Sequence, residues 1–131
     1  MAKIIHSMIR VLSPEKSIDF YAKAFGLVVA NQFDFEDFSL IYLRNEENDV
    51  ELELTHNHDQ QEAYTHGDGY GHLAFVVDDL ESEHKRFDEL GYAPSKIVEF
   101  NREGSLMAKF FFLKDPDGYD IEVLQKWGRY Q

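Results

Sequence analysis

Cysteine is absent from this chain of 131 residues. Its absence excludes disulfide frameworks, thiolate zinc sites, iron–sulfur clusters and a cysteine nucleophile. A bound metal ion would have to be held by histidine, aspartate or glutamate. Two common sequence motifs are also missing, the glycine-rich loop that cradles phosphates and the G-x-S-x-G nucleophile elbow. The sequence therefore does not support nucleotide-dependent or serine-hydrolase chemistry.

Basic residues and long apolar runs are also scarce. Lysine and arginine number 13 against 25 aspartates and glutamates, which gives a formal net charge of −12. This charge repels nucleic-acid phosphates and anionic membrane surfaces. The longest apolar runs, such as residues 110–113, are far below the roughly 18 residues of a membrane span. Residues 1–10 lack the apolar core of a signal peptide, and we expect a soluble cytoplasmic protein.

The residues that are present predict alternating helices and strands in the first half. Apolar residues make up 44% of the chain, enough at this length to fill the core of one domain. Ser13 is the expected N-cap of the first helix, and the polar segment 57–70 is expected to be a loop. The expected elements are a strand at 6–11, a helix from Pro14 to the stop at Gly26, and strands at 38–43 and 50–55.

The second half repeats this order. We expect Asp78 or Asp79 to cap its helix, and we interpret segment 99–105 as a loop and His84, inside the helix, as a surface residue. The expected elements are a strand at 72–77, a helix to about Leu90 ended by Gly91, and strands at 109–113 and 121–124.

Matching landmarks in the two halves indicate an internal duplication. Histidines open the first strand of each half, glycines close each helix, and glutamates lie in a late strand of each half. The three pairs, His6 with His72, Gly26 with Gly91 and Glu53 with Glu122, are separated by 66, 65 and 69 residues. This near-constant offset predicts two copies of a β-α-β-β-β unit. We expect one α+β domain, 1–131, made of modules at about 1–66 and 67–131.

The duplicated histidines and glutamates form a candidate metal-ligand set. His6, Glu53, His72 and Glu122 offer two neutral imidazoles and two carboxylates, which suit a divalent transition metal. Strand phase places Glu53 on the face opposite the leucines of its strand, and the apolar neighbours of Glu122 face away from it. The sequence thus predicts that both carboxylates point off the hydrophobic face into a cleft.

Other interpretations of these residues remain open. A histidine at a strand start is more often structural than a ligand, and alternating glutamates commonly form the solvated face of an antiparallel strand. The matching positions in both halves favour the metal site. A second cluster, His56, His58 and His66, lies in or beside the polar loop, where it forms either a second metal site or, more simply, a solvated loop.

Several ordered motifs resemble the vicinal oxygen chelate superfamily, and within it the short bacterial type of glyoxalase I, or lactoylglutathione lyase. The resemblance covers most of the chain. The motifs are HSMIRVLSPEKSIDFYAKAFGL, VELELTHN, GYGHLAFVVDDL and FFFLKDPDGYDIEVLQ. It implies a fold of two β-α-β-β-β modules whose open, barrel-like sheet is completed in a homodimer.

The resemblance also implies a site and a reaction. The family's metal ligands correspond to His6 and Glu53 from one chain and His72 and Glu122 from the other. The presence of a glutamate, Glu53, favours glyoxalase I, because methylmalonyl-CoA epimerases resemble this pattern but have glutamine at the corresponding position. The implied reaction converts the hemithioacetal of methylglyoxal and glutathione into S-lactoylglutathione through an enediolate. Glu122 is the expected principal base and Glu53 the second carboxylate.

Substrate contacts, the metal and the alternatives follow from the same resemblance. Arg10 and Asn57 are expected to hold glutathione, and Arg102 is a further candidate cation. The short chain implies Ni²⁺ or Co²⁺, although Zn²⁺ also suits the ligands. The alternatives are another enzyme of the superfamily, an epimerase or a lyase or transferase using a different thiol, and a ligand-sequestering protein of the bleomycin-resistance type.

Overall fold

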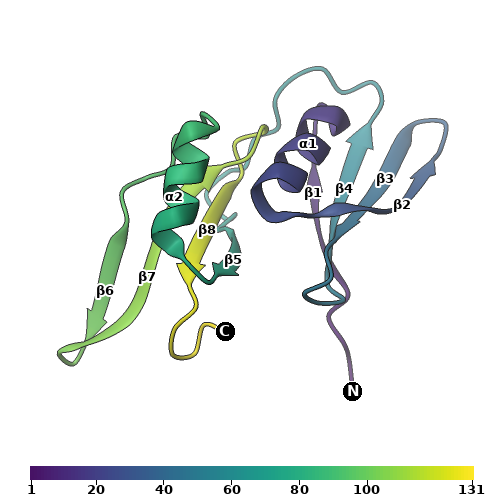
Figure 1. Ribbon diagram of the computed structural model, residues 1–131. Coiled ribbons are helices and arrows are strands. Elements are labelled where there is room, and N and C mark those ends of the chain that lie inside the picture. The colour runs from purple at the N-terminus through teal and green to yellow at the C-terminus, as the bar shows by residue number, and fades with distance from the viewer. The chain divides into compact units, whose positions relative to one another are not determined.

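Each half of the chain forms a four-stranded mixed sheet with one helix against it (Figure 1). The computed structural model describes residues 1–131 and divides into two compact units, Met1–Thr65 and His66–Gln131. The first unit contains β1 (His6–Arg10), α1 (Pro14–Phe25), β2 (Val28–Asp34), β3 (Phe38–Arg44) and β4 (Glu51–Asn57). The second contains β5 (Leu73–Val77), α2 (Leu80–Glu89), β6 (Val98–Arg102), β7 (Ser105–Lys114) and β8 (Asp120–Gln125).

The two sheets have the same topology. Their strand orders are β1-β4-β3-β2 and β5-β8-β7-β6. In each sheet the first strand is parallel to the last strand of its unit, and the other neighbours are antiparallel. The predicted α+β class and the duplicated β-α-β-β-β unit are confirmed.

Both helices begin at their predicted caps. Ser13 accepts a hydrogen bond from the Lys16 amide at 3.4 Å, and Gly26 ends α1 with φ at 64°, a left-handed conformation that favours glycine. In α2 the N-cap is Asp79, the second of the two predicted candidates, whose carboxylate accepts from the Ser82 amide.

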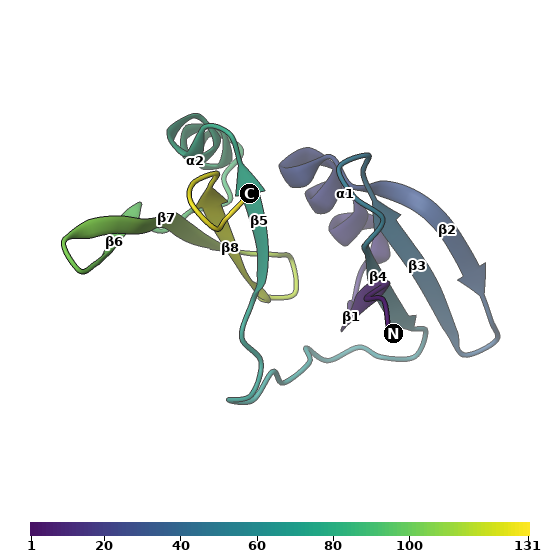
Figure 2. The same cartoon turned by 90° about the horizontal axis from the view of Figure 1, so that it is seen from below.

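The core of each unit lies between the helix and one face of its sheet, and Figure 2 shows these layers from below. In the first unit Tyr21 of α1 is buried with Ile41 and Leu54 of the sheet. In the second unit Phe87 of α2 packs edge-on against Phe111 at 5.9 Å between ring centroids. Because side chains alternate across a strand, the residues between these buried positions lie on the opposite face of each sheet.

His84 is not the surface residue that its polar neighbours in the sequence suggest. Its Nε2 lies 2.8 Å from the Ser95 carbonyl oxygen, and its ring meets Phe111 edge-on at 5.0 Å. The side chain is half-buried because it lies between α2 and the sheet.

Strands β2 and β6 were not located by sequence periodicity. Every residue of both strands is exposed, and a register shift interrupts each ladder, between Val29 and Asn31 and between Phe100 and Asn101. An edge strand with neither face in the core has no apolar alternation to detect.

The segment 99–105, interpreted from the sequence as a loop, is instead mostly a tight hairpin. Arg102 pairs with Ser105 across the turn, and the two residues between them, Glu103 and Gly104, have φ of 53° and 80°. Two central residues with positive φ join antiparallel strands with the twist that the strands require. The prediction of a loop was therefore wrong here.

None of the helices has the length and apolar character needed to cross a membrane.

Candidate active site

The sheet face away from the helix carries the predicted site residues in the first unit. His6, Met8 and Arg10 share one side of β1, and the register pairs Met8 with Glu53 of β4. Tyr42 of β3 lies opposite Glu53 on the other side. Register alone therefore brings a histidine, a carboxylate and a phenol together on one face.

His6 and Glu53 are in direct contact. His6 Nε2 lies 3.0 Å from Glu53 Oε2, with side-chain exposures of 35% and 10%. The hydroxyl of Tyr42 donates to the other oxygen, Glu53 Oε1, at 3.1 Å. The pKa of Tyr42 is raised above its ordinary value, first by burial and then by the bond to Glu53, so the phenol is protonated at neutral pH and acts as a donor.

The second unit contains the equivalent pair. His72 immediately precedes β5, and its Nε2 lies 3.7 Å from Glu122 Oε2, with side-chain exposures of 41% and 17%. Glu122 pairs in register with Phe112 of β7, whose ring meets His72 edge-on at 5.3 Å. The two pairs occupy matching places in the two sheets.

The tight turn before β8 sets the register of Glu122. Asp115 accepts hydrogen bonds from the amides of Asp117 and Tyr119 at 2.9 and 3.0 Å. Gly118 has φ of 84°, a conformation that suits glycine. From this turn the ladder runs from Lys114 opposite Asp120 to Phe112 opposite Glu122.

The donor atoms of both pairs suit a divalent metal ion. Two ligands on one ion, each bonded at about 2.0–2.2 Å, are roughly 3.0–3.5 Å apart in octahedral or tetrahedral geometry. The observed separations of 3.0 and 3.7 Å are close to this range. Each unit brings one histidine and one glutamate together in this way, and no group of three or more His, Asp or Glu side chains that could hold a metal ion is found in the structure.

The predicted substrate residues are distributed over both units. Arg10 pairs in register with Thr55, and Asn57 lies two residues further along the same face of β4, where its Nδ2 donates to the Tyr64 hydroxyl at 3.3 Å. Both residues therefore share the face of His6 and Glu53. Arg102 lies instead at the turn of the β6–β7 hairpin.

Arg102 is far from the carboxylate of its own unit. It pairs with Ser105, whereas Glu122 pairs with Phe112. The seven residue steps of β7 from Ser105 to Phe112 span about 23 Å at the usual rise of a strand. Within its unit, Arg102 is not brought together with Glu122.

The histidines of the polar loop do not assemble a second group of metal ligands in the structure. Both ring nitrogens of His58 are engaged, Nδ1 at 3.0 Å from the Glu36 carbonyl and Nε2 at 2.8 Å from the Ser39 hydroxyl. His66 belongs to the second unit and stacks on Tyr119 at 4.0 Å. These contacts favour the structural interpretation of the loop.

Tyr42 is the site residue that sequence reasoning missed. Strand phase offers a signal, because Phe38, Leu40 and Tyr42 alternate with the buried residues of β3. A tyrosine among alternating aromatic and aliphatic residues is typical of a core, so only the register opposite Glu53 identifies its hydroxyl as part of the site.

Comparison with known proteins agrees with this architecture. The model of the Glyoxalase/Bleomycin resistance protein/Dioxygenase superfamily matches residues 3–123, and the chain belongs to that family. Lactoylglutathione lyase of Neisseria meningitidis serogroup A is 35% identical over 95% of this chain and 91% of its own length. The Pseudomonas aeruginosa protein of the same name is 34% identical over 92% and 80%.

Solved structures show the same fold. The trypanothione-dependent glyoxalase I of Leishmania major superposes with a TM-score of 0.76 at 32% identity, over 96% of this chain and 88% of its own. Glyoxalase I of Zea mays gives a TM-score of 0.77 at 27% identity, over 96% of this chain and 45% of its own. Together with the lyases above, these similarities make the chain an enzyme, a glyoxalase I-like lyase.

Proposed function

We propose that this enzyme is a metal-dependent lactoylglutathione lyase. It isomerises the hemithioacetal of methylglyoxal and glutathione to S-lactoylglutathione through an enediolate. The observation that carries the proposal is the His–Glu pair at the same place in both sheets, His6 with Glu53 and His72 with Glu122. Chance placement of the same two ligand types at matching positions is a poor explanation of this symmetry.

The two pairs together form the proposed ligand set of one metal ion. In the proposed homodimer, His6 and Glu53 of one subunit combine with His72 and Glu122 of the other. When bound, a divalent metal supplies positive charge beside the two vicinal oxygens of the substrate and so lowers the energy of the enediolate. Ni²⁺ and Co²⁺ are the favoured ions, and Zn²⁺ is compatible with the same ligands.

Glu122 is the proposed principal base. Its carboxylate takes the proton from the C–H bond of the hemithioacetal carbon, and the electron pair of that bond forms the enediolate. Return of the proton to the neighbouring carbon, together with transfer of the hydroxyl proton from one substrate oxygen to the other, completes the isomerisation, with no change in composition. Glu53 is the second carboxylate of the site and is more buried than Glu122.

Local cations are needed to bind an anionic thiol to a chain of net charge −12. Arg10 is the proposed partner of a glutathione carboxylate, because a guanidinium pairs with a carboxylate through two hydrogen bonds. Asn57 lies on the same sheet face and supplies an amide. Arg102 lies far from Glu122 of its own unit, so it is a candidate only for contacting substrate at a different part of the proposed homodimer.

The identity of the thiol is the open choice within this function. The Neisseria and Pseudomonas relatives bear the name lactoylglutathione lyase, whereas the Leishmania enzyme is described as trypanothione-dependent. We favour glutathione because the bacterial relatives match at slightly higher identity over a similar share of this chain. The second candidate is an enzyme that uses a different thiol with the same proposed metal ligands and the same proposed base.

The test is an assay with controlled metal loading. The chelated protein, reloaded separately with Ni²⁺, Co²⁺ or Zn²⁺, should form thioester from methylglyoxal plus glutathione, followed by its ultraviolet absorbance. Elemental content should be about one ion per subunit, as two equivalent sites per dimer require. Metal binding with activity only toward another thiol selects the second candidate. Ligand binding without metal would indicate a sequestering protein and overturn the proposal.

A further inference from the structure

The two halves of the site differ at the position that faces each glutamate from the neighbouring antiparallel strand. Tyr42 lies opposite Glu53 in the first sheet, and Phe112 lies opposite Glu122 in the second. Both rings meet the histidine of their own unit edge-on, Tyr42 with His6 at 5.9 Å between centroids and Phe112 with His72 at 5.3 Å. The aromatic framework is therefore duplicated, and the chemical difference is one hydroxyl group.

That hydroxyl completes the contacts of one carboxylate. Glu53 has both oxygens engaged, Oε2 by His6 at 3.0 Å and Oε1 by Tyr42 at 3.1 Å. Glu122 has its histidine at the longer distance of 3.7 Å, and the phenyl ring of Phe112 cannot donate a hydrogen bond. Glu53 is thus contacted through both of its oxygens, whereas Glu122 has one, longer contact with its histidine.

The ring that presents the hydroxyl is itself held in place. Tyr42 lies edge-on to Phe33 of the neighbouring strand at 6.3 Å, in addition to its contact with His6. Aromatic contacts on two sides restrict the rotation of the ring. The hydroxyl is consequently directed at Glu53 before any metal ion binds. The Glu53 carboxylate is therefore already oriented, and binding a metal ion costs it little conformational entropy.

We propose that Tyr42 is a positioning residue that fixes the Glu53 carboxylate as a metal ligand and makes the two halves of the site functionally unequal. Glu53 stays in one orientation, whereas Glu122 keeps the freedom to approach and leave the substrate carbon. The inference rests on the proposed function, because it assigns separate roles to the two carboxylates of that site.

The test moves the hydroxyl between the halves. Three variants are compared with wild type: Tyr42→Phe, Phe112→Tyr and the double exchange. A matched control is Tyr130→Phe, which removes a phenol hydroxyl from the C-terminal turn. Metal affinity is measured by calorimetry with Ni²⁺ and with Zn²⁺, and kcat and KM are measured separately on the loaded proteins. Circular dichroism establishes that each variant is folded.

Tyr42→Phe should weaken metal binding by roughly 10-fold or more, the usual cost of losing an outer hydrogen bond to a ligand, and should leave KM unchanged. Phe112→Tyr should bind metal at least as tightly as wild type but show a reduced kcat. Equal metal affinity in wild type and Tyr42→Phe, or an equal loss in Tyr130→Phe, overturns the inference and leaves the proposed function intact. A wild-type protein that binds no divalent metal overturns both.

Discussion

Glu53 and Glu122 occupy equivalent places in the chain but different surroundings in the structure. Their side chains are 10% and 17% exposed, and only Glu53 accepts a hydrogen bond from a tyrosine. A general base must change its position or protonation during the reaction. The more exposed and less constrained carboxylate suits that role, which is why the roles of the two residues can be separated experimentally.

Substitution of the proposed base should lower turnover far more than it lowers stability. Glu122→Gln keeps the size of the side chain and an oxygen ligand but removes the proton acceptor. We expect kcat to fall by about 10²–10⁴-fold, the usual contribution of a positioned base. Glu53→Gln is the matched comparison and should mainly weaken metal binding. The test is to measure steady-state kinetics at saturating metal and to check the metal content of each variant. A near-normal kcat in Glu122→Gln would contradict the assignment of Glu122 as the base.

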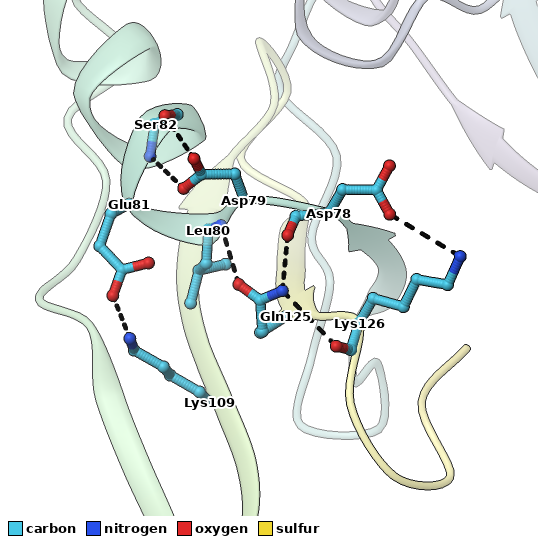
Figure 3. Close-up of polar contacts among 8 residues, drawn as sticks. All are labelled: Asp78, Asp79, Leu80, Glu81, Ser82, Lys109, Gln125 and Lys126. Atoms are coloured by element: carbon cyan, nitrogen blue, oxygen red, sulfur yellow. Dashed lines mark hydrogen bonds and ion pairs between the residues drawn. The ribbon is translucent and has the colours of Figure 1, made fainter.

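At the scale of elements, the end of β8 is tied to the beginning of α2 by one side-chain amide (Figure 3). Gln125 donates from Nε2 to the Asp78 carbonyl at 2.7 Å, and its Oε1 accepts from the Leu80 amide at 3.0 Å. The Leu80 side chain is fully buried. One glutamine therefore satisfies both backbone groups that flank the helix cap.

Removal of this amide should destabilise the second unit. Gln125→Ala leaves the part-buried Leu80 amide without its partner, which costs about 1–3 kcal/mol in the free energy of unfolding, and also removes the bond to the exposed Asp78 carbonyl. Gln125→Glu keeps the acceptor for Leu80 but places a carboxylate against the Asp78 carbonyl, so it should not restore stability. Urea denaturation provides the measurement. Gln131→Ala, which removes only a contact within the C-terminal turn, should be nearly neutral, and a similar loss there would refute the argument.

The cap of α2 should make stability depend on pH. The pKa of Asp79 is lowered chiefly by its hydrogen bond from the Ser82 amide, and also by the Ser82 hydroxyl (Figure 3). Because the folded pKa lies below the unfolded one, the carboxylate contributes its full stability above the unfolded pKa, at about 3.9. The contribution is lost as the pH falls through the folded pKa.

Asp79→Asn retains a capping acceptor but removes the titration. We expect the melting temperature of wild type to exceed that of Asp79→Asn by a few degrees at neutral pH, with the difference shrinking below about pH 4. Asp78→Asn changes the net charge equally, yet its carboxylate only faces Lys126 at 3.8 Å. A pH-independent difference for Asp79→Asn, or the same profile for Asp78→Asn, would contradict this role of the cap.

At the scale of the whole molecule, the sheet faces away from the helices carry exposed apolar side chains beside the His–Glu pairs. Met8 and Phe33 in the first unit are 39% and 50% exposed, and Val76 and Phe100 in the second are 41% and 53% exposed. Exposed apolar surface of this kind commonly marks a protein–protein contact. It is consistent with the proposed homodimer, in which each metal site takes one pair from each subunit.

Subunit mixing tests that assembly. One variant carries His6→Ala with Glu53→Ala, and the other carries His72→Ala with Glu122→Ala; each should be inactive alone. A mixed dimer would contain one intact site and one doubly impaired site. Random mixing should therefore recover about a quarter of the wild-type activity. Sites built from both pairs of a single chain would recover none, and folded, dimeric but inactive mixtures would contradict the shared site.

Local patterns determined much of what was predicted. The helix from Ser13 to Gly26 follows from a cap, a proline and a glycine that act within a few residues of one another. The duplication was visible because histidines and glutamates recur at a near-constant spacing. Strands β3, β4, β7 and β8 were found because one of their faces is buried, which imposes alternation on the sequence.

The remaining features depend on contacts between residues distant in the chain. Edge strands β2 and β6 have no buried face, so they exist only through their hydrogen bonds to β3 and β7. The contact of Tyr42 with Glu53 arises from the register between two strands, which no local pattern encodes. The sequence by itself determined the residue types available to hold a metal ion, whereas the tertiary structure decided which partners hold each carboxylate, because strand pairing sets those distances.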